Sequence, residues 1–116
     1  MKPQSAKAKG RKLQQWTRDV ILENFPDLEP DDVRSTSMGC GGEDLQLSPA
    51  ARRKFGFSVE CKAQERLNVW EAYEQACSNS GNHEPLLVMK KNRKKPLIVM
   101  DAEEFVQLMK KLSDSK

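Results

Sequence analysis

Apolar and polar residues alternate along residues 57–62, which read Phe-Ser-Val-Glu-Cys-Lys. A period of two predicts a β-strand with its apolar side chains on one face and its polar side chains on the other. Glu60 and Lys62 then lie on the same face, roughly 6 to 7 Å apart at about 3.3 Å per residue. A second alternating run begins at Asp44 and ends at Leu47, and antiparallel pairing of the two strands would bring Asp44 toward Glu60.

Two further stretches have the three-to-four-residue spacing of apolar positions that predicts helices. The first covers residues 10–24 and ends before Pro26, because proline interrupts the hydrogen-bond pattern of a helix. The second covers residues 67–79. The residues expected to face inward from these two helices are Leu13, Trp16, Val20, Ile21, Leu67, Trp70, Tyr73 and Cys77.

The remaining segments complete a small mixed domain. Residues 86–89 and 97–100 read as short strands, and Asp101 with Glu104 forms a capping box that begins a final helix over residues 102–112. The order αββαββα predicts an α/β fold. We expect an α+β sandwich in which helices flank one small mixed four-stranded sheet.

The length of 116 residues fits one domain. We expect residues 1–9 to form a basic flexible tail and residues 10–116 to form the folded domain. The net charge is only +3, from 20 basic and 17 acidic side chains. The basic residues are nevertheless clustered near the N-terminus, at residues 52–54 and at residues 90–95. Such clusters suit a polyanion, although a solvated surface can have the same composition.

Several other chemistries lack the residues that they need. The 3 cysteines are isolated, so neither a zinc site nor a disulfide framework is expected, and His83 has no histidine partner. Residues 34–42 read as a small, flexible loop without the Gly-Lys-Ser/Thr ending of a phosphate-binding loop. No apolar run approaches the roughly 18 residues that span a bilayer, and the N-terminus lacks the apolar core of a signal peptide. We therefore expect a cytoplasmic protein with no membrane partner.

Asp44, Glu60 and Lys62 together suit the hydrolysis of a phosphodiester. Mg²⁺ prefers oxygen ligands and keeps several waters, so two carboxylates and a backbone carbonyl are a sufficient contribution from the protein. Asp44 and Glu60 supply the carboxylates, and Cys61, between Glu60 and Lys62, supplies the carbonyl. Lys62 can orient the attacking water or help to deprotonate it. The alternative is that Glu60 and Lys62 form a solvent-facing pair with no chemical role.

Four short motifs follow one another along the chain. They are Lys9-Gly10 at the start of a helix, Arg34-Ser35 before a loop of small residues, Asp44-Leu45, and Glu60-Cys61-Lys62 before a helix and a hairpin. In order and approximate spacing, they resemble the PD-(D/E)XK nuclease superfamily, and most closely its archaeal-type Holliday junction resolvase branch. The resemblance covers residues 9–105, which is nearly the whole chain.

This resemblance implies a restriction-endonuclease-like fold, a Mg²⁺ or Mn²⁺ site, hydrolysis of DNA and a homodimer with one active site for each of two strands. It implies that Asp44 and Glu60 bind the metal and that Lys62 is catalytic. The branch often has a glutamate where this chain has Gln14, which can hydrogen-bond a metal-bound water but brings no charge. The residues expected to bind nucleic acid are Lys9, Arg11, Lys12, Arg34, Ser35, Ser37, Arg52, Arg53, Lys54 and Gln75.

More than one function remains open at this point. The first is a metal-dependent DNA endonuclease, with branched DNA such as a Holliday junction as a candidate substrate. A nuclease of the same fold could instead act on nicked, flapped or simple duplex DNA. The fold could also persist in a nucleic-acid-binding protein that has lost activity, an alternative that Gln14 favours, and a protein-interaction module is a third class. The branch itself points to a prokaryotic or viral protein.

Overall fold

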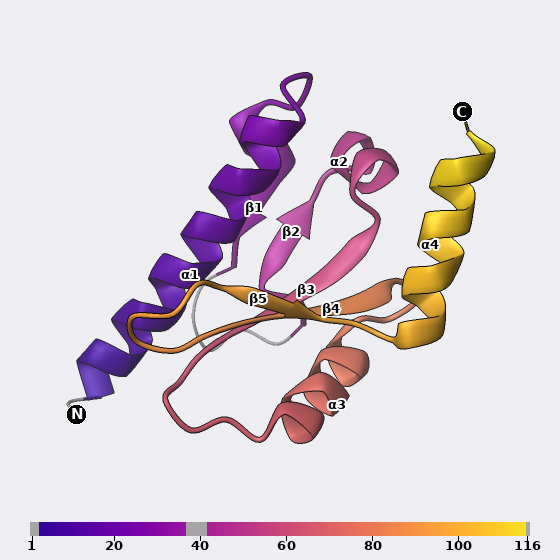
Figure 1. Ribbon diagram of the computed structural model, residues 1–116. Coiled ribbons are helices and arrows are strands. Elements are labelled where there is room, and N and C mark those ends of the chain that lie inside the picture. Colours follow the sequence, from indigo (N-terminus) through magenta and orange to yellow (C-terminus); the bar gives the residue numbers. More distant parts are fainter. Residues whose placement is uncertain (1–2, 37–41, 116) are drawn as a thin grey trace.

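Helices and strands alternate along the chain and pack into a mixed α/β domain (Figure 1). The computed structural model describes residues 3–36 and 42–115, with side chains from residue 6 onward. Within this part of the chain, four α-helices surround two sheets, one of two strands and one of three. None of the described helices is long and apolar enough to cross a membrane.

The larger sheet contains β3 (Phe57–Ala63), β4 (Glu84–Lys90) and β5 (Leu97–Val99), in that order. β3 and β4 are parallel, with Glu60 beside Leu87, and β5 is antiparallel to β4. A parallel pair needs a long crossover connection, which here contains α3. β3 is the edge of this ladder, so one side of its backbone can contact other parts of the chain.

The smaller sheet is a pair of short antiparallel strands, β1 (Val33–Ser35) and β2 (Leu45–Leu47). A single turn of 3₁₀-helix, Pro30–Asp32, precedes β1. α2 (Pro49–Lys54) follows β2, and Ser48 caps it by accepting a hydrogen bond from the Ala51 N–H at 3.1 Å. The small sheet and α2 together lie beside the free edge of β3 (Figure 1).

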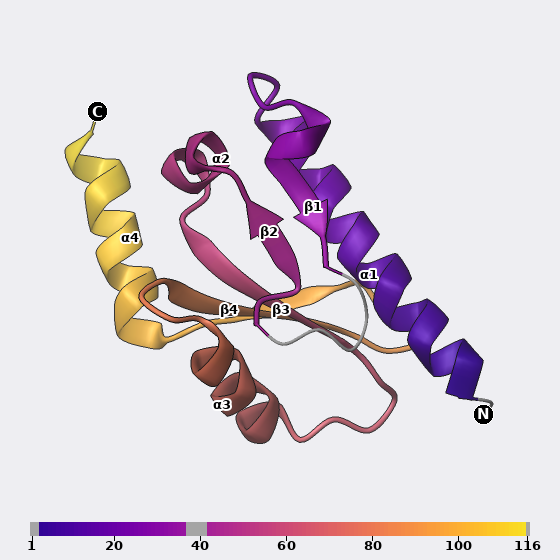
Figure 2. The same ribbon diagram turned by 180° about the vertical axis from the view of Figure 1, so that it is seen from behind.

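Two helices cover opposite faces of β3. From α1 (Pro3–Asn24), Leu13 and Ile21 pack with Val59 and Cys61 on the apolar face. α3 (Val69–Asn79) covers the other face, where Glu60 lies. The last helix, α4 (Ala102–Asp114), is on the opposite side of the molecule from α1 (Figure 2). The Asp101 carboxylate caps it by accepting from the Glu104 N–H at 3.0 Å, which is one of the two hydrogen bonds of the predicted capping box.

The first helix begins earlier than the sequence predicts. The expected flexible tail includes residues 3–9, yet these residues form the first turns of α1. Proline is favoured in the first turn of a helix, and the alanines and lysines that follow have high helix propensity. The helix therefore extends beyond the predicted residues 10–24, and the flexibility of residues 1–9 stays a prediction.

The arrangement of the strands also differs from the prediction. The sequence marked no strand over residues 33–35 and no helix over residues 49–54, but these residues form β1 and α2. β2 pairs with β1 instead of β3. A three-residue strand carries too little alternation to be recognised without its partner. The strands are consequently divided between two sheets in place of one four-stranded sheet, and the restriction-endonuclease-like strand order stays a prediction.

The inward face of α3 is not the predicted one. Ala72 and Ala76 are buried, whereas Cys77 is exposed and Trp70 is 81% exposed. Small side chains allow the helix backbone to approach the sheet closely. The inner face of α3 is therefore formed by the two alanines and not by the larger residues. Trp16 of α1, which the spacing also predicts to face inward, is 46% exposed.

Candidate active site

Asp44 is held against the free edge of β3 by two hydrogen bonds. Its N–H donates to the Val59 carbonyl at 2.8 Å, and its Oδ2 accepts from the Cys61 N–H at 2.7 Å. The N–H and C=O of one strand residue point toward the same edge of the strand. The carbonyl of Cys61 therefore points toward Asp44 and away from β4. Asp44 thus reaches the part of β3 that carries Glu60, although β2 pairs with β1.

Glu60 and Lys62 lie on the same face of β3, as the alternation predicts. Lys62 Nζ is 3.5 Å from Glu60 Oε2, and Asn79 Nδ2 of α3 donates to Glu60 Oε1 at 3.1 Å. Glu60 is only 5% exposed. Burial of a carboxylate costs several kcal/mol unless charged or hydrogen-bonding partners compensate for it. The two residues are therefore not the solvent-facing pair that the sequence left as an alternative.

The Asp44 carboxyl lies in an environment that disfavours its charge. Burial raises its pKa to about 6, and the charge of Glu60 acts in the same direction. The Cys61 N–H, the Lys62 ammonium and the Gln14 side chain lower the pKa and only partly offset these effects. Asp44 and Glu60 are thus close enough to repel one another, and a cation bound between them would relieve this repulsion.

Gln14 joins the group from α1. It is 4% exposed, its Oε1 accepts from the Ser35 hydroxyl at 2.7 Å, and its side chain hydrogen-bonds Asp44. Because the amide oxygen is turned to Ser35, the amide nitrogen is the group that can donate to the Asp44 carboxylate. Gln14 therefore orients Asp44. Ser35, which the resemblance assigns to nucleic-acid binding, orients Gln14.

The chemistry of these groups fits a hard divalent cation. The carboxylates of Asp44 and Glu60 and the carbonyl of Cys61 are oxygen ligands, which Mg²⁺ and Mn²⁺ prefer. The described residues contain no group of three or more histidine, cysteine, aspartate and glutamate side chains suited to a metal ion. Water would therefore supply a large part of the coordination shell. The Cys61 thiol faces the core, 3.9 Å from the Thr17 hydroxyl, and burial raises its pKa to about 12, so it is not a ligand here.

A polar cavity of about 190 Å³ opens beside Lys62. The beginning of α3 lines it with Asn68 and Glu71, and Gln75 follows one turn later. Gln75, one of the residues expected to bind nucleic acid, therefore shares a cavity with Lys62. This cavity leaves space for part of a substrate beside the lysine.

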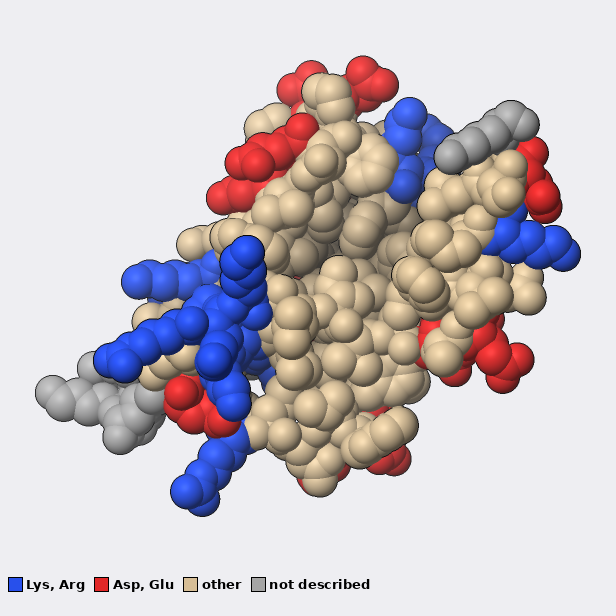
Figure 3. Space-filling view, in the orientation of Figure 1, with Lys and Arg blue, Asp and Glu red and all other residues tan. Residues whose placement is uncertain are grey.

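The predicted nucleic-acid-binding residues of α1 lie on a basic surface. Lys and Arg side chains gather where the N-terminal half of α1 meets the β4–β5 hairpin, whereas Asp and Glu gather at the other end of α1 (Figure 3). Lys9 and Lys12 line a cavity in this region, and Arg11 is exposed. Arg34 is exposed on β1, and Ser37 lies outside the described residues.

The basic residues of α2 differ in their availability. Arg52 donates to the Glu43 carboxylate at 2.7 Å and to the Phe57 carbonyl at 3.0 Å, so it tethers α2 to the start of β3. These two bonds make Arg52 a weaker candidate for phosphate binding than its neighbours. Arg53 and Lys54 are exposed and line a cavity of about 370 Å³ between α2 and α4.

Asn79 is a site residue that the sequence analysis did not identify. It follows Ala72 and Ala76 at positions i+7 and i+3, so the three share the face of α3 that packs on the sheet. The sequence signal for Asn79 was the four-residue spacing of Ala72 and Ala76, which marks the inner face of the helix. The larger residues Trp70 and Tyr73 pointed to a different face.

Residues from α1, the start of β2, β3 and the end of α3 thus meet at one edge of the larger sheet. Gln14, Asp44, Glu60 and Lys62 are among them, as the sequence predicts, and Asn79 is the addition. Comparison with protein-family models, curated proteins and solved structures found no match for this chain.

Proposed function

We propose that the protein is a metal-dependent DNA endonuclease of the PD-(D/E)XK type. The observation that carries the proposal is the burial of two carboxylates beside a lysine at the free edge of β3. Glu60 pairs with Lys62 at 3.5 Å, and the charge of Glu60 contributes to the raised pKa of Asp44. A purely structural ion pair would not need a second, partly buried carboxylate in the same place.

In this proposal Asp44, Glu60 and the Cys61 carbonyl hold Mg²⁺ or Mn²⁺. The bound cation would neutralise charge on the phosphate and lower the pKa of the attacking water. Gln14 fixes the orientation of Asp44, and the Cys61 N–H holds the other side of the same carboxylate. Lys62 orients the water or the phosphate from the face opposite the core and receives or supplies a proton.

DNA is the proposed substrate because lysine side chains gather on the surface at a distance from the candidate active site. Lys9 and Lys12 are on the same helix as Gln14 and line a cavity together with Lys90 and Lys91 of the β4–β5 hairpin. Phosphate neutralisation by such side chains supplies most of the sequence-independent affinity for DNA. A homodimer would place two sites on two strands, and the substrates in question are branched, nicked, flapped and simple duplex DNA.

A second candidate function is DNA binding without cleavage. Both oxygens of Glu60 already have partners, since Asn79 donates to Oε1 and Lys62 lies beside Oε2. Gln14 brings no charge to the group. These contacts favour a site that has lost the metal and kept the fold.

A cleavage assay decides between the two functions. The protein is incubated with Mg²⁺ or Mn²⁺ and with linear, nicked, flapped and four-way junction DNA. We expect cleavage by the native protein and loss of at least about 100-fold with Lys62→Ala, in line with the usual contribution of an acid–base group. Lys110→Ala, an exposed lysine on α4, is the matched control and should retain full activity.

Lys62→Ala removes the cation beside the buried Glu60 carboxylate, so its Tm should fall, and cleavage is compared at a temperature at which circular dichroism shows both proteins to be folded. The DNA affinity of the variant should stay close to that of the native protein. Cleavage by Lys62→Ala within a few-fold of the native rate would refute the catalytic role. DNA binding without any metal-dependent cleavage of the four substrates would favour the second candidate.

A further inference from the structure

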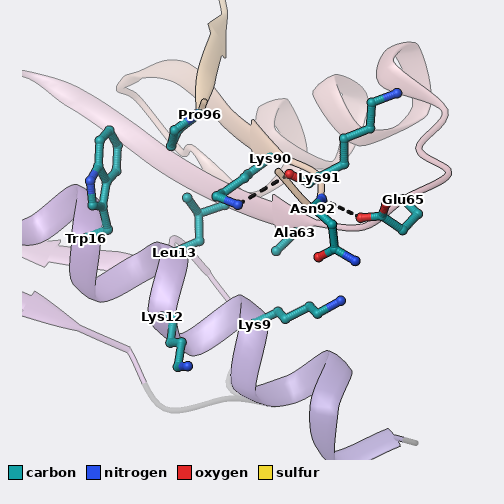
Figure 4. A pocket seen from close by; sticks show the side chains of 10 residues that line it. All are labelled: Lys9, Lys12, Leu13, Trp16, Ala63, Glu65, Lys90, Lys91, Asn92 and Pro96. Atoms are coloured by element: carbon teal, nitrogen blue, oxygen red, sulfur yellow. Dashed lines mark hydrogen bonds between the residues drawn. The ribbon is translucent and has the colours of Figure 1, made fainter. Parts of the chain in front are cut away.

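A cavity of about 320 Å³ lies between α1 and the β4–β5 hairpin (Figure 4). Its apolar wall consists of Leu13 and Trp16 from α1, Ala63 at the end of β3, and Pro96 before β5. The volume is at the small end of the roughly 300 to 1,000 Å³ of ligand pockets. Trp16 is 46% exposed, so part of its indole ring is open to a ligand.

Lysines make up most of the remaining lining of this cavity. They are Lys9, Lys12, Lys90 and Lys91, and among the lining residues that the structure describes only Glu65 is acidic. The Glu65 carboxylate already accepts from the Asn92 N–H at 2.6 Å, and Lys90 Nζ donates to the Lys91 carbonyl at 3.3 Å (Figure 4). An aromatic wall with a cationic rim matches the two parts of a nucleotide, a flat base and an anionic phosphate.

A second cavity continues the cationic rim along the hairpin. It has a volume of about 300 Å³, shares Lys90 and Lys91 with the first, and adds Lys94 and Lys95. Successive lysines at the edges of two neighbouring cavities suit a chain of phosphates better than a single free nucleotide. Bases of an intact duplex are stacked inside it and cannot enter such a cavity, so the fitting ligand is an unpaired strand.

The cavity and the candidate active site lie on different sides of α1. Trp16 and Gln14 are two residues apart, which places them about 160° apart around a helix of 3.6 residues per turn. Between them, the face that includes Leu13 packs on β3. A strand held in the cavity can therefore pass the N-terminal half of α1 without occupying the active site.

We propose that the cavity between α1 and the β4–β5 hairpin binds one unpaired nucleotide of a DNA strand, with the base stacked on Trp16 and the phosphates on the surrounding lysines. This inference rests on the proposed function for the identity of the polymer. It narrows the substrates of that function to DNA with an unpaired strand, such as a flap or an opened branch point. Simple duplex DNA would then bind through its phosphates alone.

Tryptophan fluorescence tests the position of the base. The chain has 2 tryptophans, and Trp70, 81% exposed on α3, is the matched control. In Trp70→Phe the remaining Trp16 should be quenched by an oligothymidylate of about 12 nucleotides, because a stacked base lies on the ring. In Trp16→Phe the remaining Trp70 should not be quenched. Quenching of both tryptophans to the same extent, or of neither at saturation, would overturn the proposal.

Affinity provides a second test. Trp16→Ala should weaken binding of the oligothymidylate by about 5- to 150-fold, the usual effect of removing a stacking partner, whereas Trp16→Phe and Trp70→Ala should change it little. Binding of an intact duplex should be nearly unaffected by Trp16→Ala. Free thymidine monophosphate should bind far more weakly than the oligonucleotide. Equal affinities for the two ligands, or an equal loss with Trp16→Ala and Trp70→Ala, would contradict a strand-binding cavity.

These measurements need no metal and no cleavage, so the two proposals fail separately. If Lys62→Ala and the native protein show the same Trp16 quenching but neither cleaves any DNA, the endonuclease proposal is wrong and the nucleotide cavity stands. If the native protein cleaves flapped DNA and Trp16→Ala does so with unchanged KM and kcat, the cavity proposal is wrong and the endonuclease stands.

Discussion

From the raised pKa of Asp44 we predict an effect on the stability of the fold that can be tested without any cleavage assay. Asp44→Asn keeps an acceptor for the Cys61 N–H and removes the negative charge beside Glu60. Since the folded protein disfavours the ionised form of Asp44, the substitution should stabilise the fold at neutral pH. At the same time it should remove one ligand of the proposed metal site.

The expected magnitude follows from the pKa. Burial raises the Asp44 pKa from the ordinary 3.8 to about 6, which corresponds to at most about 3 kcal/mol at about 1.4 kcal/mol for each pH unit. Asp44 is only partly buried, and solvent screens part of this penalty, so we expect Asp44→Asn to gain about 1 to 2 kcal/mol at pH 7.5. For a domain of this size, that gain is roughly 4 to 10 °C in Tm.

The pH dependence has a definite sign. Below pH 3.8 Asp44 is protonated in both the folded and the unfolded chain, so the native protein has no penalty from its charge. As the pH rises through 3.8 toward 6, the unfolded chain ionises first and the native protein loses stability. The difference in Tm between Asp44→Asn and the native protein should therefore be small near pH 4, grow up to about pH 6 and stay constant above it.

Thermal unfolding followed by circular dichroism at several pH values measures this difference. Asp32→Asn is the matched control with the opposite sign, because the Ser48 hydroxyl and the Glu29 N–H lower the Asp32 pKa. That variant should lose stability at neutral pH. Mg²⁺ should raise the Tm of the native protein more than that of Asp44→Asn, since a ligand that binds only the folded state stabilises it. An Asp44→Asn protein that folds but is no more stable than the native protein at pH 7.5 would refute the reasoning.

Two further predictions concern charge around the site. Gln14→Glu adds a third carboxylate to the group that contains Asp44 and Glu60. Without metal the Tm of this variant should therefore fall, and the metal concentration for half-maximal cleavage should decrease. If that metal concentration does not change, Gln14 does not face the cation. When Lys9 and Lys12 are both changed to glutamine, the slope of log affinity against log salt concentration should become shallower. The expected change is about 0.9 for each duplex phosphate that the variant no longer neutralises. An unchanged slope would show that these lysines are only solvated.

Several features of the protein follow from the sequence alone because they depend on local geometry. Alternation places Glu60 and Lys62 on one face of a strand whatever surrounds it, since successive side chains of a strand point to opposite faces. The cap of α4 is equally local, because Asp101 and the Glu104 N–H are three residues apart. The alternation was therefore enough to bring together the Glu60 and Lys62 side chains, which lie 3.5 Å apart.

Only the tertiary structure decided which distant residues join that pair. Asp44 reaches the Cys61 N–H across 17 positions of sequence because β2 pairs with β1 and leaves the edge of β3 free. Packing of α3 through small residues, which have no strong hydrophobic signal, buries Glu60 and brings Asn79 to it. The exposure of Trp16 likewise depends on how α1 lies across the sheet. These contacts join segments that are far apart in the sequence. No local pattern predicts them, because they depend on how complete helices and strands pack together.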